Sequence, residues 1–239
     1  MSPKRLARVA GVFYLFVGIF GGFAEGFVDP KLYVAGNAAA TAGNVVANSG
    51  LVRIGVASHL VDAAFFVLTA IALYSLLNHV HKGVARAMLV FVVVAAAIIT
   101  LNAVFQFEGL QIATTGSYAT AFGVAGSQAL VLLLLDTQHY GTLAAQVFFG
   151  LWLAPLGYLA YRSGLFPKAL GVVLVAATVS YLADLFAAFL LPDLAKQIHT
   201  FLIIVPAIGE IWMVLYLLVV GVRSPREAER APSAAIGHS

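Results

Sequence analysis

Ionisable and amide side chains occur inside the long apolar stretches of this sequence, where they are costly. Asp62, Asp184 and Glu210 each lie within such a stretch, and His59 precedes Asp62 by three residues, on the same face of a helix. An ionised group in hydrocarbon costs about 2.5–3.5 kcal/mol on insertion scales, so such groups face a protein interior and have partners. Amides in two further stretches extend the set of candidate binding residues: Asn102, Gln106 and Gln146.

The candidate carboxylates lack the partners that usually accompany buried acids. No Lys or Arg lies deep in the apolar stretches, which leaves three ways to tolerate the acids: protonation, pairing with histidine, or binding of a metal, a cation or a basic ligand. A plainer alternative is that Asp62 and Asp184 hydrogen-bond each other and only clamp two helices together. We assign no metal ligand to the set, and the sequence identifies no cofactor.

The composition places the chain in a membrane. Of its 239 residues, 62% are hydrophobic and only 10% are charged, whereas soluble domains are near half apolar and about a quarter charged. We therefore expect the lipid bilayer as its partner. Cysteine is absent, which excludes disulfides, thiolate metal ligands and cysteine nucleophiles. The basic residues flank the apolar stretches, and no phosphate-binding glycine motif occurs, which argues against nucleic-acid and nucleotide binding.

Six apolar stretches are long enough to cross the roughly 30 Å of hydrocarbon as helices. They cover residues 6–24, 52–77, 84–107, 139–162, 168–191 and 199–222. We therefore predict an all-α fold with a single transmembrane domain over residues 1–222. Residues 25–51 are expected to form an outer loop, with or without a short surface helix. The polar tail over residues 223–239 is expected to be disordered and cytoplasmic.

A seventh apolar stretch, residues 119–135, is assigned by the distribution of basic residues. With six spans, ten of the 13 Lys and Arg residues fall on the side of the two termini, which the positive-inside rule places in the cytoplasm. A seventh span would move Arg162 and Lys168 outside. We therefore expect 119–135 to be an outer-face helix, re-entrant or interfacial, with a true span as the alternative. The predicted location is a bacterial inner membrane, with a polar pocket that opens outward.

Glycines and prolines mark places where helices pack closely or bend. Gly18 and Gly22 form a GxxxG pair, which suits close packing, although glycine is also tolerated in membrane helices without that role. Pro155 and Pro206 interrupt the fourth and sixth spans. The carbonyl groups freed at such breaks either line a site or accompany a simple kink.

Short motifs along most of the chain resemble those of a known family. They are Arg162–Lys168 (RSGLFPK), Gly171, Tyr181–Asp184 (YLAD), Gly209–Glu210 and Leu217–Val222 (LLVVGV), with Ala10–Leu15 (AGVFYL) and Leu73–Leu77 (LYSLL) nearer the N-terminus. In these the chain resembles the bacterial multi-pass membrane proteins called domain of unknown function 4386. The resemblance implies an integral membrane protein of unknown function and supplies no catalytic residues.

Three functions are compatible with these residues. The first is binding or transport of a proton, a cation or a small amphiphile in the outward-facing pocket. The second is an intramembrane metal-dependent lipid hydrolase, with ligands drawn from His59, Asp62, Asp184, His199 and Glu210, although the H-E-x-x-H pattern is absent. The third is a structural or assembly protein whose polar cluster holds the helices together. A small-molecule or lipid ligand is expected only under the first two.

Overall fold

The structure, a computed structural model, describes residues 1–223, so the predicted disordered tail lies outside the described residues from position 224 onward. The described part is helical apart from short connections and contains no strand, which confirms the all-α prediction. Six helical stretches are long and apolar enough to cross a membrane, as predicted. They cover Pro3–Leu32, Ser49–Leu77, Lys82–Thr114, Gly116–Ser163, Lys168–Leu190 and Pro192–Val219.

The six stretches comprise ten helical elements, and a further short helix, α3, lies between the first two stretches. The first half of the chain forms α1 (Pro3–Phe23), the π-helix η1 (Ala24–Val28), α2 (Asp29–Leu32), α3 (Ala38–Ala47), α4 (Ser49–Leu77) and α5 (Lys82–Thr114). The second half forms α6 (Gly116–Leu151), α7 (Leu153–Ser163), α8 (Lys168–Leu190), α9 (Pro192–Leu202) and α10 (Ile204–Val219). Local sequence sets several boundaries: Ser2 caps α1, Asn37 caps α3, and Gly164 ends α7 with a φ of 70°.

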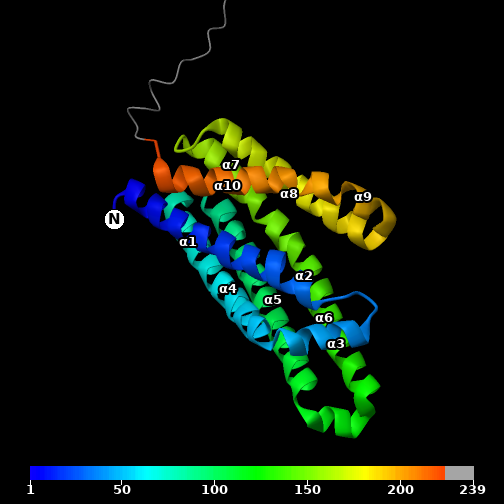
Figure 1. The fold of residues 1–239 in the computed structure, drawn as a ribbon. Coiled ribbons are helices and arrows are strands. Elements are labelled where there is room, and N and C mark those ends of the chain that lie inside the picture. Colours follow the sequence, from blue (N-terminus) through cyan, green and yellow to red (C-terminus); the bar gives the residue numbers. More distant parts are fainter. Residues whose placement is uncertain (224–239) are drawn as a thin grey trace, which may run out of the picture.

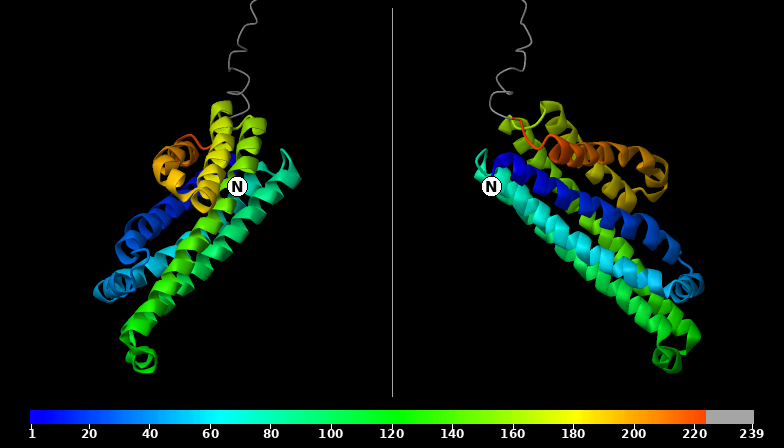
Figure 2. Two further views of the ribbon diagram at one scale, coloured as in Figure 1. Left: turned by 90° about the vertical axis from the view of Figure 1, so that its right-hand side faces the viewer. Right: turned by 60° about the vertical axis from the view of Figure 1, so that its left-hand side comes forward.

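The helices form two groups that meet at one end of the molecule (Figures 1 and 2). Helices α1, α4, α5 and α6 pack in succession, and α7, α8 and α10 form the second group, with α9 at its far end. Both described ends of the chain lie at the same end of the bundle, where Arg8 Nη2 donates to the Val219 carbonyl at 3.4 Å and the Arg223 amide donates to the Leu165 carbonyl at 3.0 Å. The elements α2 and α9 therefore lie at the opposite end.

Residues 119–135 differ from the prediction of a separate outer-face helix. They form the first half of α6, which continues without a break through Leu151 except for a kink at Gly123. With α5, this half of α6 makes a hairpin that extends past the other helices (Figure 1). At about 1.5 Å per residue, a helix as long as α5 measures roughly 50 Å, more than the roughly 30 Å of hydrocarbon. The polar residues at 136–138 lie within the helix and have partners near the end of the first span: Tyr33 donates to Asp136, and Gln138 donates to Asp29 of α2.

Residues 25–32 also differ from the prediction, which placed them in an outer loop. They continue the first span through η1 and α2. Pro30 has no amide hydrogen to donate to the carbonyl of Gly26, so the regular α-helical bonding cannot continue past this point. The chain instead widens into a π turn, in which the Asp29 amide donates to the Ala24 carbonyl. Two acids, Glu25 and Asp29, are thereby carried on a helix that packs inside the bundle.

Close helix packing occurs at glycines other than the predicted GxxxG pair. A Cβ atom at Gly157 would lie 2.6 Å from the Gly171 carbonyl oxygen, so α7 and α8 are in backbone contact there. A Cβ atom at Gly11 would lie 2.9 Å from Leu217 of α10. By contrast, nothing lies within 4 Å of a Cβ built at Gly18 or Gly22. Gly11 and Gly157 therefore permit close contact between α1 and α10 and between α7 and α8.

Candidate functional site

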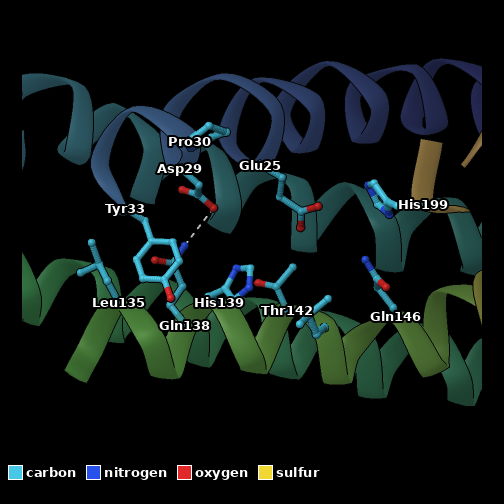
Figure 3. A pocket seen from close by; sticks show the side chains of 11 residues that line it. Glu25, Asp29, Pro30, Tyr33, Leu135, Gln138, His139, Thr142, Gln146 and His199 are labelled. Atoms are coloured by element: carbon cyan, nitrogen blue, oxygen red, sulfur yellow. Dashed lines mark hydrogen bonds between the residues drawn. The ribbon is translucent and has the colours of Figure 1, made fainter. Parts of the chain in front are cut away.

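Two cavities open into the interior of the bundle, and they share one residue, Glu25. The first, here called the Asp29 cavity, has a volume of about 430 Å³ and is lined by Glu25, Asp29, Pro30, Tyr33, Leu135, Gln138, His139, Thr142, Leu143, Gln146 and His199. Most of these side chains are visible in Figure 3. The second, here called the Asp62 cavity, has a volume of about 160 Å³ and is lined by Val17, Gly21, Gly22, Glu25, Asp62, Phe66, Ile99, Phe149, Trp152, Tyr181 and Glu210.

Asp29 is fixed by side chains from three other helices. Gln106 Nε2 of α5 donates to Asp29 Oδ1 at 2.7 Å, and Gln138 Nε2 of α6 donates to Oδ2 at 2.9 Å. His59 Nε2 of α4 lies 3.4 Å from Oδ2 at ion-pair distance. Of the predicted candidates, His59 and Gln106 therefore meet a carboxylate, but that carboxylate is Asp29 and not Asp62. Because both oxygens of Asp29 already have partners, this acid joins four segments of the bundle.

Glu25 has a different environment from Asp29, although the two acids are four residues apart. Within the described residues it has no hydrogen bond and no salt bridge, and its side chain is partly buried. Figure 3 shows its carboxyl group projecting from the π-helix toward α6, between Asp29 on one side and His199 and Gln146 on the other. Glu25 therefore presents a free carboxylate to both cavities.

The Asp62 cavity contains two further acids. Asp62 is buried, with 4% of its surface exposed, and its Oδ1 atom has no hydrogen-bond partner in the described structure. Gly21 of α1 makes room for this carboxylate, because a Cβ there would lie 3.3 Å from it. Glu210 is held on both sides: Tyr14 donates to Oε2 at 2.7 Å, and Tyr181 donates to Oε1 at 3.0 Å. Asp62 is thus available to a ligand, while Glu210 is already hydrogen-bonded.

Asp184 does not meet Asp62, in contrast to the predicted clamp between the two acids. It pairs instead with His199 of α9, whose Nδ1 lies 2.9 Å from Oδ2 and 3.0 Å from Oδ1. Asp184 is buried, whereas His199 is about half exposed and lines the Asp29 cavity. This pair joins α8 to α9 at the edge of the larger cavity.

The remaining predicted amides lie around the Asp29 cavity. Gln146 lines it directly, and its Oε1 atom is buried without a hydrogen-bond partner in the described structure. Asn102 lies behind it and donates from Nδ2 to Thr142 Oγ1 at 3.2 Å. At the rim, Tyr33 stacks on His139 and donates to Asp136 at 2.5 Å. Burial, and then this hydrogen bond, raise the pKa of the Tyr33 phenol above its ordinary value.

The acids of the two cavities have no Lys or Arg partner in the described structure. Within residues 1–223, the salt bridges that involve Lys or Arg are confined to the exposed pair Lys196 and Asp193. The basic residues at these cavities are histidines: His59 pairs with Asp29, and His139 and His199 line the Asp29 cavity. An arrangement of this kind favours a positively charged occupant, because a cation offsets the repulsion between the acids and the cost of their burial.

The geometry does not assemble the metal centre that the hydrolase hypothesis requires. Among the described residues, no group of three or more histidine and acidic side chains is placed to hold a metal ion. The five ligands considered for such a centre are divided among three places. His59 contacts Asp29, Asp184 contacts His199, and Asp62 and Glu210 line the smaller cavity.

Comparisons with known proteins place the chain in a family. The family model described as "Domain of unknown function (DUF4386)" matches residues 9–221. An uncharacterized protein from the archaeon Archaeoglobus fulgidus is 30% identical over 155 residues, which cover 65% of this chain and 76% of that protein. No solved structure matches the chain. These findings confirm the family resemblance seen in the sequence motifs, and the chain belongs to the DUF4386 family.

Proposed function

We propose that this chain is an integral membrane protein that binds a small cation in the Asp29 and Asp62 cavities. The observation that carries the proposal is the pair of free carboxylates, Glu25 and Asp62, which line one cavity without a Lys or Arg partner in the described structure. An unpaired buried acid is destabilising. Such a pair is therefore tolerated best when a positively charged ligand occupies the space between them.

The shared position of Glu25 suggests how a cation passes between the two cavities. Glu25 lines both, so an ion held by it on the Asp29 side remains in contact with a carboxylate as it reaches Asp62. The π-helix that carries Glu25 supports this role, because single π turns within helices occur frequently at functional sites. Binding of a cation is the first step in this proposal, and transport is its extension.

The proposal is tested by the thermal unfolding of the purified protein in detergent micelles. Chlorides of sodium, potassium, ammonium and alkylammonium ions are compared at equal ionic strength. A ligand at about 100 times its Kd stabilises the folded state by about 2.7 kcal/mol, which corresponds to a rise in Tm of about 5–10 °C for a chain of this size. We expect one class of cation to give a saturable rise that Asp62→Asn diminishes. If no cation raises the Tm, the proposal is wrong.

We further propose that both termini are cytoplasmic in an inner membrane. Eight basic residues of the described part lie at the end of the bundle that holds residues 1 and 223: Lys4, Arg5, Arg8, Lys82, Arg86, Arg162, Lys168 and Arg223. This concentration supports a cytoplasmic assignment for that end.

This orientation predicts the behaviour of topology reporters. A reporter fused after Val222 and one inserted between α4 and α5 are expected to be active only in the cytoplasm. A reporter inserted at Gly36, between α2 and α3, is expected on the other side of the membrane. A periplasmic signal after Val222 would reverse the orientation, and the cavities would then open toward the cytoplasm.

A further inference from the structure

We propose that the Asp62 cavity is a site for a small alkylammonium ion, recognised by its charge and by its hydrocarbon surface. This inference rests on the proposed function and specifies the class of cation. Among the described residues that line this cavity, those with a charge or a ring system are of two kinds. Three are carboxylates, namely Glu25, Asp62 and Glu210, and four are aromatic, namely Phe66, Phe149, Trp152 and Tyr181.

The aromatic side chains form a fixed wall. Phe66 and Trp152 are buried, with 4% and 1% of their surfaces exposed. Their ring centroids lie 5.1 Å apart at an interplanar angle of 83°, and the ring of Phe149 lies 6.1 Å from that of Phe66 at 53°. The ring of Tyr14, which is outside the cavity lining, lies 5.4 Å from that of Trp152 at 68°. Rings at such angles surround a space from several directions, and the faces of aromatic rings attract cations that have lost their water.

The size of the cavity favours an organic ion over a bare inorganic one. Its volume of about 160 Å³ is close to that of an apolar cavity, about 150 Å³, that accommodates benzene. Sodium or potassium would leave most of this space empty. The aromatic part of the wall would also give such an ion few of the oxygen ligands that replace its water. An ammonium ion with about four carbon atoms fills the space and places methyl groups against the rings.

The distribution of hydrogen bonds indicates where the ammonium group binds. Tyr14 and Tyr181 already donate to Glu210, one to each oxygen. Asp62 Oδ1 is buried and has no partner in the described structure, so it can accept a hydrogen bond from an N–H group. Glu25 lies at the junction with the larger cavity and adds a second negative charge. The geometry therefore places the ammonium nitrogen at Asp62 and the hydrocarbon toward Phe66 and Trp152.

The fluorescence of Trp152 provides a direct measurement of occupancy. The chain has two tryptophans, and the other one, Trp212, lines a separate apolar surface groove on α10. In a Trp212→Phe protein, all tryptophan emission comes from the wall of the Asp62 cavity. This protein is titrated with tert-butylammonium chloride and, as a neutral control of nearly the same size and shape, with tert-butanol. Sodium chloride at matched ionic strength controls for salt effects.

We expect a saturable change in Trp152 emission with tert-butylammonium and none with tert-butanol or sodium. Asp62→Asn is expected to weaken binding at least tenfold, through the loss of the carboxylate charge. Phe66→Leu is expected to weaken it roughly tenfold, through the loss of a desolvated cation–ring contact.

Equal responses to tert-butylammonium and tert-butanol would overturn the inference, because the cavity would then select size alone. If sodium or potassium raises the Tm while tert-butylammonium leaves Trp152 unchanged, the inference is wrong and the proposed function stands. If no cation has either effect, both are wrong. The comparison of tert-butylammonium with tert-butanol uses no substitution in the cavity, so it decides the question even if a cavity variant fails to fold.

Discussion

Replacing Glu25 with glutamine is expected to weaken cation binding at least about tenfold while leaving the ligand-free protein as stable as before or more stable. Glu25 is the carboxylate that lines both cavities, and a loss of 1.4 kcal/mol in binding corresponds to a factor of ten. A single charge a few ångströms from a bound cation in a poorly solvated site contributes more than that. The ligand-dependent rise in Tm and the Trp152 titration measure the effect.

The expected stability of the ligand-free Glu25→Gln protein follows from the absence of partners. No hydrogen bond or salt bridge to Glu25 is present in the described structure, so the substitution breaks no such bond. It does remove a negative charge from the same cavities as Asp29 and Asp62, and thereby relieves repulsion. Asp193→Asn is the matched control, because Asp193 is 93% exposed and pairs only with Lys196 on the surface. A Glu25→Gln protein that binds cations as tightly as the parent would exclude Glu25 as a ligand.

Much of this fold was predictable, because hydropathy and charge act along the chain. The six spans follow from segment length and apolar content, and the shared end of the termini follows from an even number of spans. The burial of Asp62 and His59 was also predictable, since an ionisable residue within an apolar helix must face protein. These inferences need no knowledge of which helices are neighbours.

The acids that sequence reasoning missed, Glu25 and Asp29, depend on tertiary partners. Pro30 is typical of a helix end, in agreement with the loop that was expected over residues 25–51. The chain remains helical there because Gln106, Gln138 and His59, from three different helices, supply partners for Asp29. One signal was present: the two acids follow the apolar stretch directly, four residues apart, and therefore share a helix face.

The pairings among the predicted residues were not predictable for a related reason. The position of a residue along a span gives its depth in the membrane, but not the direction in which its side chain points. The sequence left open a hydrogen bond between Asp62 and Asp184. In the structure Asp62 lies against Gly21 of α1, whereas Asp184 bonds to His199 of α9. Depth alone therefore identified residues that surround the cavities without showing which of them meet.

Replacing Asp29 with alanine is expected to destabilise the ligand-free protein, whereas Glu25→Gln is not. It leaves His59, Gln106 and Gln138 without their shared acceptor, and a buried polar group left unpaired costs about 1–3 kcal/mol. We expect the free energy of unfolding to fall by about 3 kcal/mol, measured without ligand in detergent micelles.

The control for Asp29→Ala is Asp29→Asn, which keeps one carbonyl acceptor and is expected to lose less than half as much stability. An Asp29→Ala protein as stable as the parent would show that this polar cluster does not hold the bundle together. If Asp29→Ala destabilises the protein and Glu25→Gln does not, the structural role among these acids belongs to Asp29, whose two oxygens both accept hydrogen bonds. It leaves Glu25 and Asp62, which have no such partners in the described structure, for the ligand.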